Sequence, residues 1–207
     1  VWATNTINLT QTGAIGGYRY GRSVALSGLV AVVGAPGTAV SAFFGIGSGI
    51  ARRAGLLETL DKPGVTWAKD TDSTVVALAD LPTLSADQQF SDDMAMSADW
   101  LAVGVEGDDN ANGVDAGAVY LYRNNAGTWT PHSKLTALYG RAGDHFGQGV
   151  AIEGNRLFVG APTFDGFPNS TSNAGATYVF EFNGSAWAQT LERMAPTPSV
   201  DAFFGNR

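Results

Sequence analysis

The cluster of residues best suited to chemistry is an acidic loop, GDDNANGVDAG, at residues 107–117. Carboxylate and amide oxygens bind hard cations, and calcium takes about six to eight of them. We therefore consider a calcium site formed by Asp108, Asp109, Asn110 and Asp115. The spacing does not fit an EF-hand, and Asp and Asn in loops also bond to their own backbone. A solvated turn that binds no metal is the competing interpretation.

Candidate catalytic residues are sparse. The chain has two histidines, His132 and His145, and no cysteine. Asp144 precedes His145, but neighbours on an extended strand point to opposite sides and do not form a pair. No serine lies in a G-x-S-x-G elbow. A pair of carboxylates could still cleave a polysaccharide, although most of the 19 acidic residues lie in loops. We therefore expect a protein that is not an enzyme.

Three copies of one pattern position these residues. YGRSVALSGLVAVVGAP begins at Tyr20, FSDDMAMSADWLAVGVE at Phe90 and FGQGVAIEGNRLFVGAP at Phe146, and the three align without gaps. A second block follows in each copy, as AGLLETL, AGAVYLY or AGATYVF. A tryptophan comes 12 residues after the glycine of each second block, at Trp67, Trp129 and Trp187. Such constant spacing indicates a repeat protein.

Each copy predicts four antiparallel strands and no helix. Alternating apolar residues are followed by a nearly continuous apolar run, as in a half-buried strand beside a buried one. The pairs Ser27–Gly28, Ala98–Asp99 and Gly154–Asn155 separate these two strands and suit primed hairpin turns. We expect the three recurrent tryptophans to be buried between sheets, together with Trp100 and Phe158.

The residues FG…VA…VGAP, then AG-x-x-Y-x-F, then Trp, resemble the FG-GAP repeat in its bacterial form. KLTALYGRAGDHFG, at residues 134–147, looks like the junction between two such repeats. This family builds β-propellers, including the heads of integrin α-subunits and many bacterial surface and secreted proteins. The resemblance therefore implies an all-β fold of propeller blades, each with four antiparallel strands. The second copy departs from the pattern, with Ser91 for Gly and Val105–Glu106 for Ala-Pro.

Integrin-type repeats carry an Asp-rich calcium cage between the first two strands of the repeat. Here a two-residue turn stands at that place in every copy, so the resemblance implies no calcium site of that type.

The repeats divide the chain into five parts. Residues 1–19 are the end of a preceding repeat, with Trp2 in its outer strand, and residues 204–207 begin a further one. Complete repeats occupy residues 20–89, which hold insertions, 90–145 and 146–203. Three blades do not close a ring, because propellers have at least about four. We therefore expect part of a larger propeller, which associates with itself or with the rest of that propeller.

One insertion, at residues 38–53, is apolar and rich in glycine. Its large apolar residues and its arginines are Phe43, Phe44, Ile46, Ile50, Arg52 and Arg53. A disordered loop should be polar, so we expect these apolar side chains to be buried. The insertion either seals the central channel of the propeller or docks onto a partner, with the arginines on a polar rim.

Composition and charge narrow the choice of partner. The net charge of −7 argues against nucleic acid, whose phosphates require Lys and Arg. No apolar stretch is long enough to span a membrane. We expect a secreted or cell-surface protein whose loop-rich face binds a protein or a glycan. An ancillary propeller of a secreted enzyme is the alternative, followed by a propeller that itself cleaves polysaccharide.

Overall fold

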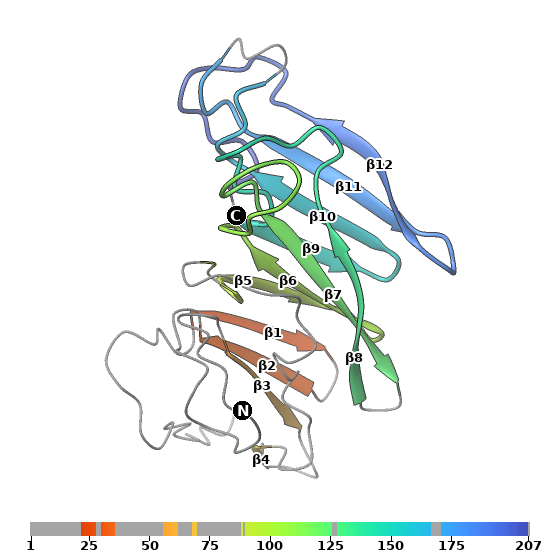
Figure 1. The fold of residues 1–207 in the computed structure, drawn as a ribbon. Coiled ribbons are helices and arrows are strands. Elements are labelled where there is room, and N and C mark those ends of the chain that lie inside the picture. The colour runs from red at the N-terminus through yellow and green to blue at the C-terminus, as the bar shows by residue number, and fades with distance from the viewer. Residues whose placement is uncertain are drawn as a thin grey trace, which may run out of the picture.

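The computed structural model describes residues 22–27, 30–35, 56–61, 68–69, 88, 90–125, 128–166 and 171–206 of the chain. These residues form three antiparallel sheets of four strands each and include no helix. Each sheet follows the chain order of its strands, and we call the sheets blades 1, 2 and 3 (Figure 1). The all-β fold of propeller-type blades is therefore confirmed, and the described blades do not close a ring.

The strands have the following bounds. Blade 1 contains β1 (Ser23–Ser27), β2 (Val30–Ala35), β3 (Leu56–Asp61) and β4 (Ala68–Lys69). Blade 2 contains β5 (Asp93–Met96), β6 (Trp100–Val105), β7 (Ala118–Asn125) and β8 (Thr128–Leu135). Blade 3 contains β9 (Gly149–Glu153), β10 (Arg156–Ala161), β11 (Ala176–Phe182) and β12 (Trp187–Arg193).

Blade 2 is packed on both of its faces. Every residue of β6 is buried, which explains its continuous apolar run WLAVGV. Leu101 and Val103 belong to the core shared with blade 1, whereas Trp100 and Ala102 belong to the core shared with blade 3. Alternate side chains of one strand thus hold two neighbouring blades together.

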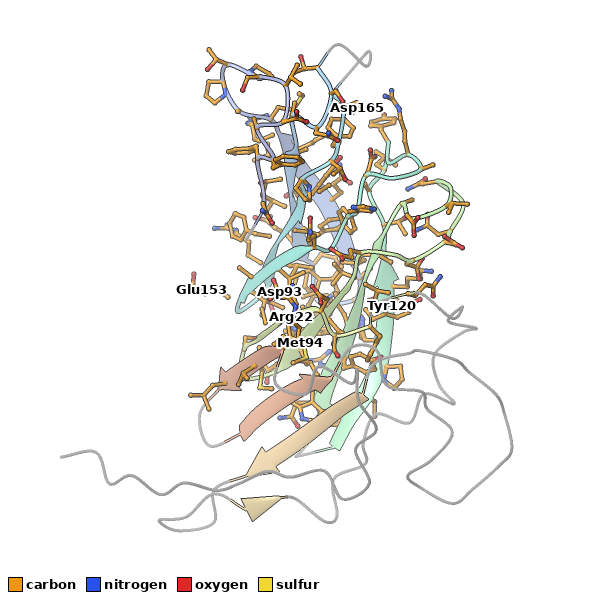
Figure 2. The ribbon with its side chains drawn as sticks, turned by 90° about the vertical axis from the view of Figure 1, so that its left-hand side faces the viewer. Arg22, Asp93, Met94, Tyr120, Glu153 and Asp165 are labelled. Carbon is orange, nitrogen blue, oxygen red and sulfur yellow. The ribbon has the colours of Figure 1, made fainter. Side chains whose placement is uncertain are left out.

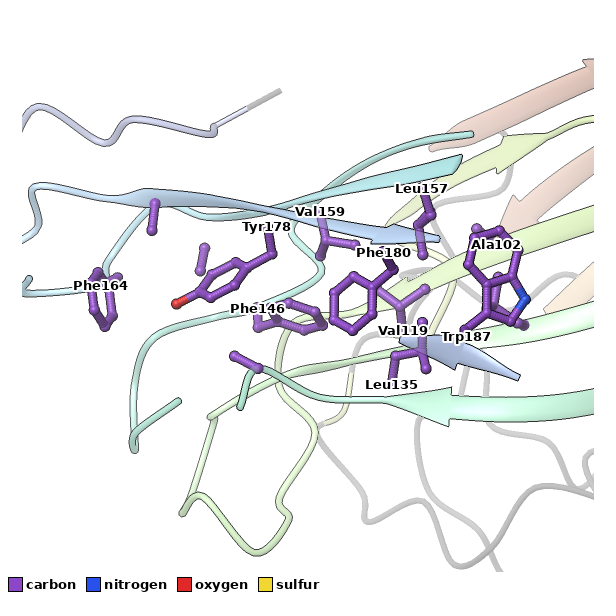
Figure 3. Packing of buried hydrophobic residues seen from close by; sticks show 14 of the residues in the cluster. Ala102, Val119, Leu135, Phe146, Leu157, Val159, Phe164, Tyr178, Phe180 and Trp187 are labelled. Carbon is purple, nitrogen blue, oxygen red and sulfur yellow. The ribbon is translucent and has the colours of Figure 1, made fainter. Parts of the chain in front are cut away.

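The core between blades 2 and 3 is dominated by aromatic rings (Figure 3). Phe146 lies edge-on to Tyr178 and to Phe180, with ring centroids 5.3 and 5.9 Å apart. Trp100 lies edge-on to Trp187 at 5.2 Å. Such edge-to-face pairs add to the stabilisation that comes from burial alone.

The recurrent tryptophans behave as predicted where the structure describes them. Trp129 and Trp187 are both buried at the start of the fourth strand, whereas Trp67 lies outside the described residues. Trp100 is buried as expected, but Phe158 is 40% exposed, so its prediction as a core residue is wrong. Phe158 corresponds to Ala102 of blade 2 and points away from the core between blades 2 and 3.

The hairpin turns differ from the prediction in two details. Ser27, which the sequence predicts to lie in the turn of blade 1, instead belongs to β1 and pairs with Val30. In blade 3, Gly154 has a φ of 53°, as a primed turn requires. Neither residue of Ala98–Asp99 has a positive φ, so the turn of blade 2 is not of the primed type.

Candidate functional site

The long loops and the short turns of blades 2 and 3 lie at opposite ends of the strands (Figure 1). Residues 106–117 join β6 to β7, and residues 136–148 lead from β8 into blade 3. These two loops bond to each other through His145 N–H to Asp115 O at 3.2 Å and Phe146 N–H to Ala116 O at 3.0 Å. We call this end of the blades the loop edge. The opposite end holds the turns at residues 98–99 and 154–155.

The aromatic-glycine pair that opens each repeat is what fastens one blade to the next. Phe146 forms a parallel bridge with Gly117, and Phe204 forms the same bridge with Gly175. A Cβ atom at Gly117 or Gly175 would collide with the carbonyl oxygen of the phenylalanine above it. The second residue of the block is therefore glycine in blades 2 and 3, because the backbone of the next repeat lies directly on it.

The two backbone hydrogen bonds that join the loops of the loop edge recur after blade 3. Phe203 N–H donates to Asn173 O and Phe204 N–H donates to Ala174 O, both at 3.0 Å. These bonds repeat those that His145 and Phe146 make one blade earlier. The loop edge thus has a backbone geometry that does not depend on the local side chains.

Ser91 is the one exception to glycine at the second position of this pair in the described repeats. Its φ is 68°, in the left-handed region where Gly147 and Gly205 have φ of 97° and 86°. Its carbonyl accepts a hydrogen bond from Ser23 Oγ of blade 1 at 2.6 Å. The backbone at this junction therefore has the same left-handed conformation with serine as with glycine, and this conformation strains the backbone of Ser91.

An ion pair also joins blades 1 and 2 at this junction. Arg22 donates from Nε and Nη2 to the two carboxylate oxygens of Asp92, at 3.0 and 3.1 Å. Figure 2 shows Arg22 beside Asp93 and Met94 of β5. Asp93 in turn accepts from Val150 N–H of blade 3 at 2.8 Å, so the first strands of all three blades are linked.

The first acidic residue of the loop, Asp108, is a buried structural group. Its carboxylate accepts a hydrogen bond from Tyr120 Oη at 2.8 Å and lies 2.6 Å from Lys134 Nζ. Burial and the bond to Asp108 raise the pKa of Tyr120 far above its usual value, so the phenol keeps its proton. Both oxygens of Asp108 therefore already have partners within blade 2.

The other acidic-loop residues shape the loop. Asp109 Oδ1 accepts from Asp115 N–H at 2.9 Å, and Asp165 Oδ1 accepts from Asn173 N–H at the same distance in blade 3. Asn110 donates from Nδ2 to Asp108 Oδ1 at 3.1 Å. Across the described residues, no group of three or more Asp, Glu, His or Cys side chains is placed to hold a metal ion. The bonds favour the solvated-turn interpretation, and the calcium site remains a prediction.

Asp144 and His145 have different surroundings. Asp144 is buried and accepts from Arg141 N–H at 2.6 Å, whereas His145 is half-buried with a φ of 53°. Burial raises the pKa of Asp144 to about 6. Thr163 Oγ1 donates to Gly143 O at 2.7 Å, so the loop of blade 3 is tied to this junction. Asp144 thus shapes the junction loop, and the neighbouring Gly143 joins that loop to blade 3.

The insertion at residues 38–53 lies outside the described residues. The structure therefore does not test its two interpretations. The residues concerned are Phe43, Phe44, Ile46, Ile50, Arg52 and Arg53.

Sequence reasoning missed three exposed apolar residues on the loop edge. Val114, Leu138 and Tyr139 are each about two-thirds exposed. Alignment of the second and third copies gives the signal, because the third copy has polar residues or proline at the same positions. An apolar residue that is present in one repeat and absent from the equivalent position of the next is not part of the core that the repeats share.

Comparison with known families agrees with these features. A sequence profile of the FG-GAP repeat family matches residues 84–122 and 129–180, which include most of blades 2 and 3. No curated protein is significantly similar to the chain. No helix able to span a membrane occurs among the described residues.

Proposed function

Because this chain carries FG-GAP repeats, which are typical of extracellular proteins and form propeller domains often involved in binding, we propose that it is a non-catalytic binding or adhesion module. In this proposal the protein is secreted or displayed at a cell surface. It presents the loop edge to a protein or a glycan.

One observation carries the proposal. The backbone hydrogen bonds that join the loops of the loop edge recur after blades 2 and 3, yet the exposed side chains on these loops differ. A rigid scaffold with variable loops is the usual basis of a binding surface. The opposite end offers little surface, because its turns at residues 98–99 and 154–155 are only two residues long.

The acidic residues of the loop edge support a non-catalytic role. Asp108 is paired with Lys134, and Asp109 and Asp165 each accept a backbone N–H within their own loop. Asp144 is buried and accepts a hydrogen bond from Arg141 N–H within the junction loop. A glycosidase needs two carboxylates that face a substrate, and these four acids serve the structure instead.

The outer faces of blades 1 and 3 support association with further chain. Val24 is 61% exposed on β1, whereas its equivalent in blade 2, Met94, is buried against blade 1. Phe158 is exposed on β10, whereas its equivalent Ala102 is buried against blade 3. Uncovered apolar faces of this kind mark contact surfaces. We therefore propose that further propeller blades or another copy cover them.

The experiment compares the two ends of the blades. Arginine is placed at two exposed alanines of the loop edge (Ala111→Arg with Ala142→Arg) or at two exposed alanines of the turn end (Ala98→Arg with Ala186→Arg). Binding of both variants to immobilised secreted proteins and to a glycan array is measured by biolayer interferometry. We expect ligands of the wild-type chain to be lost only with the loop-edge variant. Equal binding by both variants, or loss only with the turn-end variant, would contradict the proposal.

A further inference from the structure

Three large apolar side chains are exposed on the two bonded loops at the loop edge of blade 2. Val114, Leu138 and Tyr139 are 64%, 66% and 65% exposed. Val114 belongs to the loop between β6 and β7, and the other two belong to the loop between β8 and β9. We call these three residues the loop-edge patch.

Hydrogen bonds hold the two loops of the patch in a fixed relation. Asn112 Nδ2 donates to Ala137 O at 2.8 Å, next to Leu138 in the chain. Gly143 N–H donates to Val114 O at 2.9 Å. The patch is therefore preformed, and a ligand would not have to order it on binding.

The scaffold does not need apolar residues at these positions. In the third copy the equivalents of Val114, Leu138 and Tyr139 are Ser172, Pro196 and Thr197. The bond at Val114 nevertheless recurs in blade 3, since Asp201 N–H donates to Ser172 O at 3.0 Å as Gly143 donates to Val114. The three apolar side chains of the loop-edge patch thus do not serve a structural role that is common to blades 2 and 3. Each leaves apolar area in water that a partner would bury.

The exposed charges in the loop that holds Val114 are negative. Asp115 adjoins Val114 and is exposed, and Asp109 is exposed in the same loop. The nearest basic residue in the chain, Arg141, is half-buried, and its Nη1 points across to Gly166 O at 3.4 Å. With a net charge of −7 on the whole chain, this rim favours a cationic partner.

We propose that the loop-edge patch binds a basic protein segment. Apolar side chains of that segment pack on Val114, Leu138 and Tyr139, and neighbouring Lys or Arg residues lie beside Asp109 and Asp115. Two of the three patch residues are aliphatic, which suits an apolar protein side chain better than a sugar ring. This inference rests on the proposed binding function and specifies the chemistry of the partner.

The test variant replaces the patch with polar residues. Val114→Ser and Tyr139→Thr take the residues of blade 3, and Leu138→Ser keeps the N–H that donates to Gln189 Oε1 at 3.0 Å. The matched control is Val200→Ser, because Val200 is also 64% exposed and lies in the loop after β12. All these side chains are exposed, so we expect both variants to melt at the wild-type temperature.

The probes are two synthetic peptides with the same Leu-Trp-Leu core, one flanked by lysines and the other by glutamates. Binding is followed by fluorescence anisotropy at low salt and at about 0.15 M salt. We expect the lysine-flanked peptide to bind, more tightly at low salt, and the glutamate-flanked peptide not to bind. The triple variant should lower the affinity for the lysine-flanked peptide about tenfold or more, or about 1.4 kcal/mol. Val200→Ser should leave it unchanged.

Three results would overturn the inference. They are absence of binding by the lysine-flanked peptide, equal binding of both peptides, and undiminished binding by the triple variant. Loss of a glycan ligand in the triple variant, without peptide binding, would instead assign the patch to sugar. If the patch variant has no effect but Ala111→Arg with Ala142→Arg abolishes binding, only this inference fails. If neither has any effect on any ligand, the proposed function fails as well.

Discussion

Blades 2 and 3 place different side chains at one buried position. Blade 2 has Asp108 below its long loop and blade 3 has Phe164, and each side chain is 1% exposed. The backbone is the same in both, because each residue donates its N–H to the carbonyl three residues earlier and accepts from the glycine that opens the next strand. The backbone structure of the repeat therefore does not determine whether the side chain at this position is charged or apolar.

The neighbours of this position change along with it. Beside Asp108 stand Tyr120, which donates to its carboxylate, and Lys134, which pairs with it. The equivalent of Tyr120 in blade 3 is Tyr178, whose hydroxyl has no hydrogen-bond partner among the described residues. The equivalent of Lys134 is Glu192, whose pKa is raised by burial. An ion pair in one repeat thus takes the place of an aromatic contact in the next.

The largest expected effect comes from giving blade 3 the acid of blade 2. Phe164→Asp removes a buried ring and places a carboxylate near Glu192 with no lysine to neutralise it. Phe to Ala alone costs about 3–5 kcal/mol in a core, and an unpaired buried charge adds to that. We expect the variant to lose more than about 4 kcal/mol of unfolding free energy, measured by urea denaturation.

Adding the lysine of blade 2 is the control for this change. Phe164→Asp with Glu192→Lys restores the acid, tyrosine and lysine of blade 2 in the frame of blade 3. It should recover about 2 kcal/mol or more of the loss. If Glu192→Lys destabilises the Phe164→Asp variant further, the backbone of blade 3 cannot accommodate the side chains that blade 2 has at these positions.

The second effect concerns the glycine on which the next repeat lies. Gly117 has a φ of 83° and faces the backbone of Phe146, whereas Gly143 has a φ of 78° and open space around it. Ala at Gly143 should cost about 1–2 kcal/mol for the left-handed backbone alone. Ala at Gly117 should cost at least about 3 kcal/mol, because the strands must also separate. Equal losses of unfolding free energy in urea would show that the repeats are not held by this close approach.

Much of the fold follows from repetition in the sequence. The constant spacing of the aromatic residues, glycines and tryptophans predicts four-stranded blades, and the buried Trp129 and Trp187 confirm it. The error at Phe158 shows the limit. Periodicity tells which side chains share a face of a strand, but not whether another blade covers that face. Turn geometry also escaped prediction, since Ala98–Asp99 has the length of a primed turn without its backbone.

The candidate site was less predictable. The sequence shows that Asp108, Asp109 and Asp115 lie in one loop. The same sequence pattern is expected whether the acidic side chains bind a cation or the backbone of their own loop. Lys134, which pairs with Asp108, lies 26 residues away in the sequence and is brought near by the pairing of β7 with β8. The exposure of Leu138 could not be predicted from one copy of the repeat, because residue type alone does not show whether an apolar side chain is buried or exposed.

The third prediction uses a position that differs in charge between the junctions. Asp144 stands between blades 2 and 3 where the junction between blades 1 and 2 has Gln88. Burial raises the pKa of Asp144 to about 6 from the ordinary 3.8, against the opposing influence of Arg141. Folding therefore shifts the protonation equilibrium of Asp144 toward its neutral form. Relative to a neutral side chain, Asp144 destabilises the fold above about pH 6, and this penalty disappears as the pH falls to 3.8.

Asp144→Asn removes this titration while keeping an oxygen to accept Arg141 N–H. We expect the variant to be more stable than wild type at pH 7.5 and equal to it near pH 4, measured by urea denaturation at both values. The difference should be smaller than the effects above. Asp165 and His145 also face Asp144, and both residues are present in the variant as in wild type. A stability gap that grows on acidification would reverse the assignment.

The smallest effect tests whether the frame strains serine at the first junction. Ser91 is buried with a φ of 68° where later repeats have glycine. Ser91→Gly relieves about 1–2 kcal/mol of left-handed strain but adds about 0.5–1 kcal/mol of entropy to the unfolded chain. It also loses the side chain, while keeping the carbonyl that accepts from Ser23 Oγ. We expect a net gain of about 0.5 kcal/mol in urea denaturation. Ser97→Gly, at a residue without positive φ, should instead lose about 0.5–1 kcal/mol. A loss at both positions would mean that the frame accommodates serine as well as glycine.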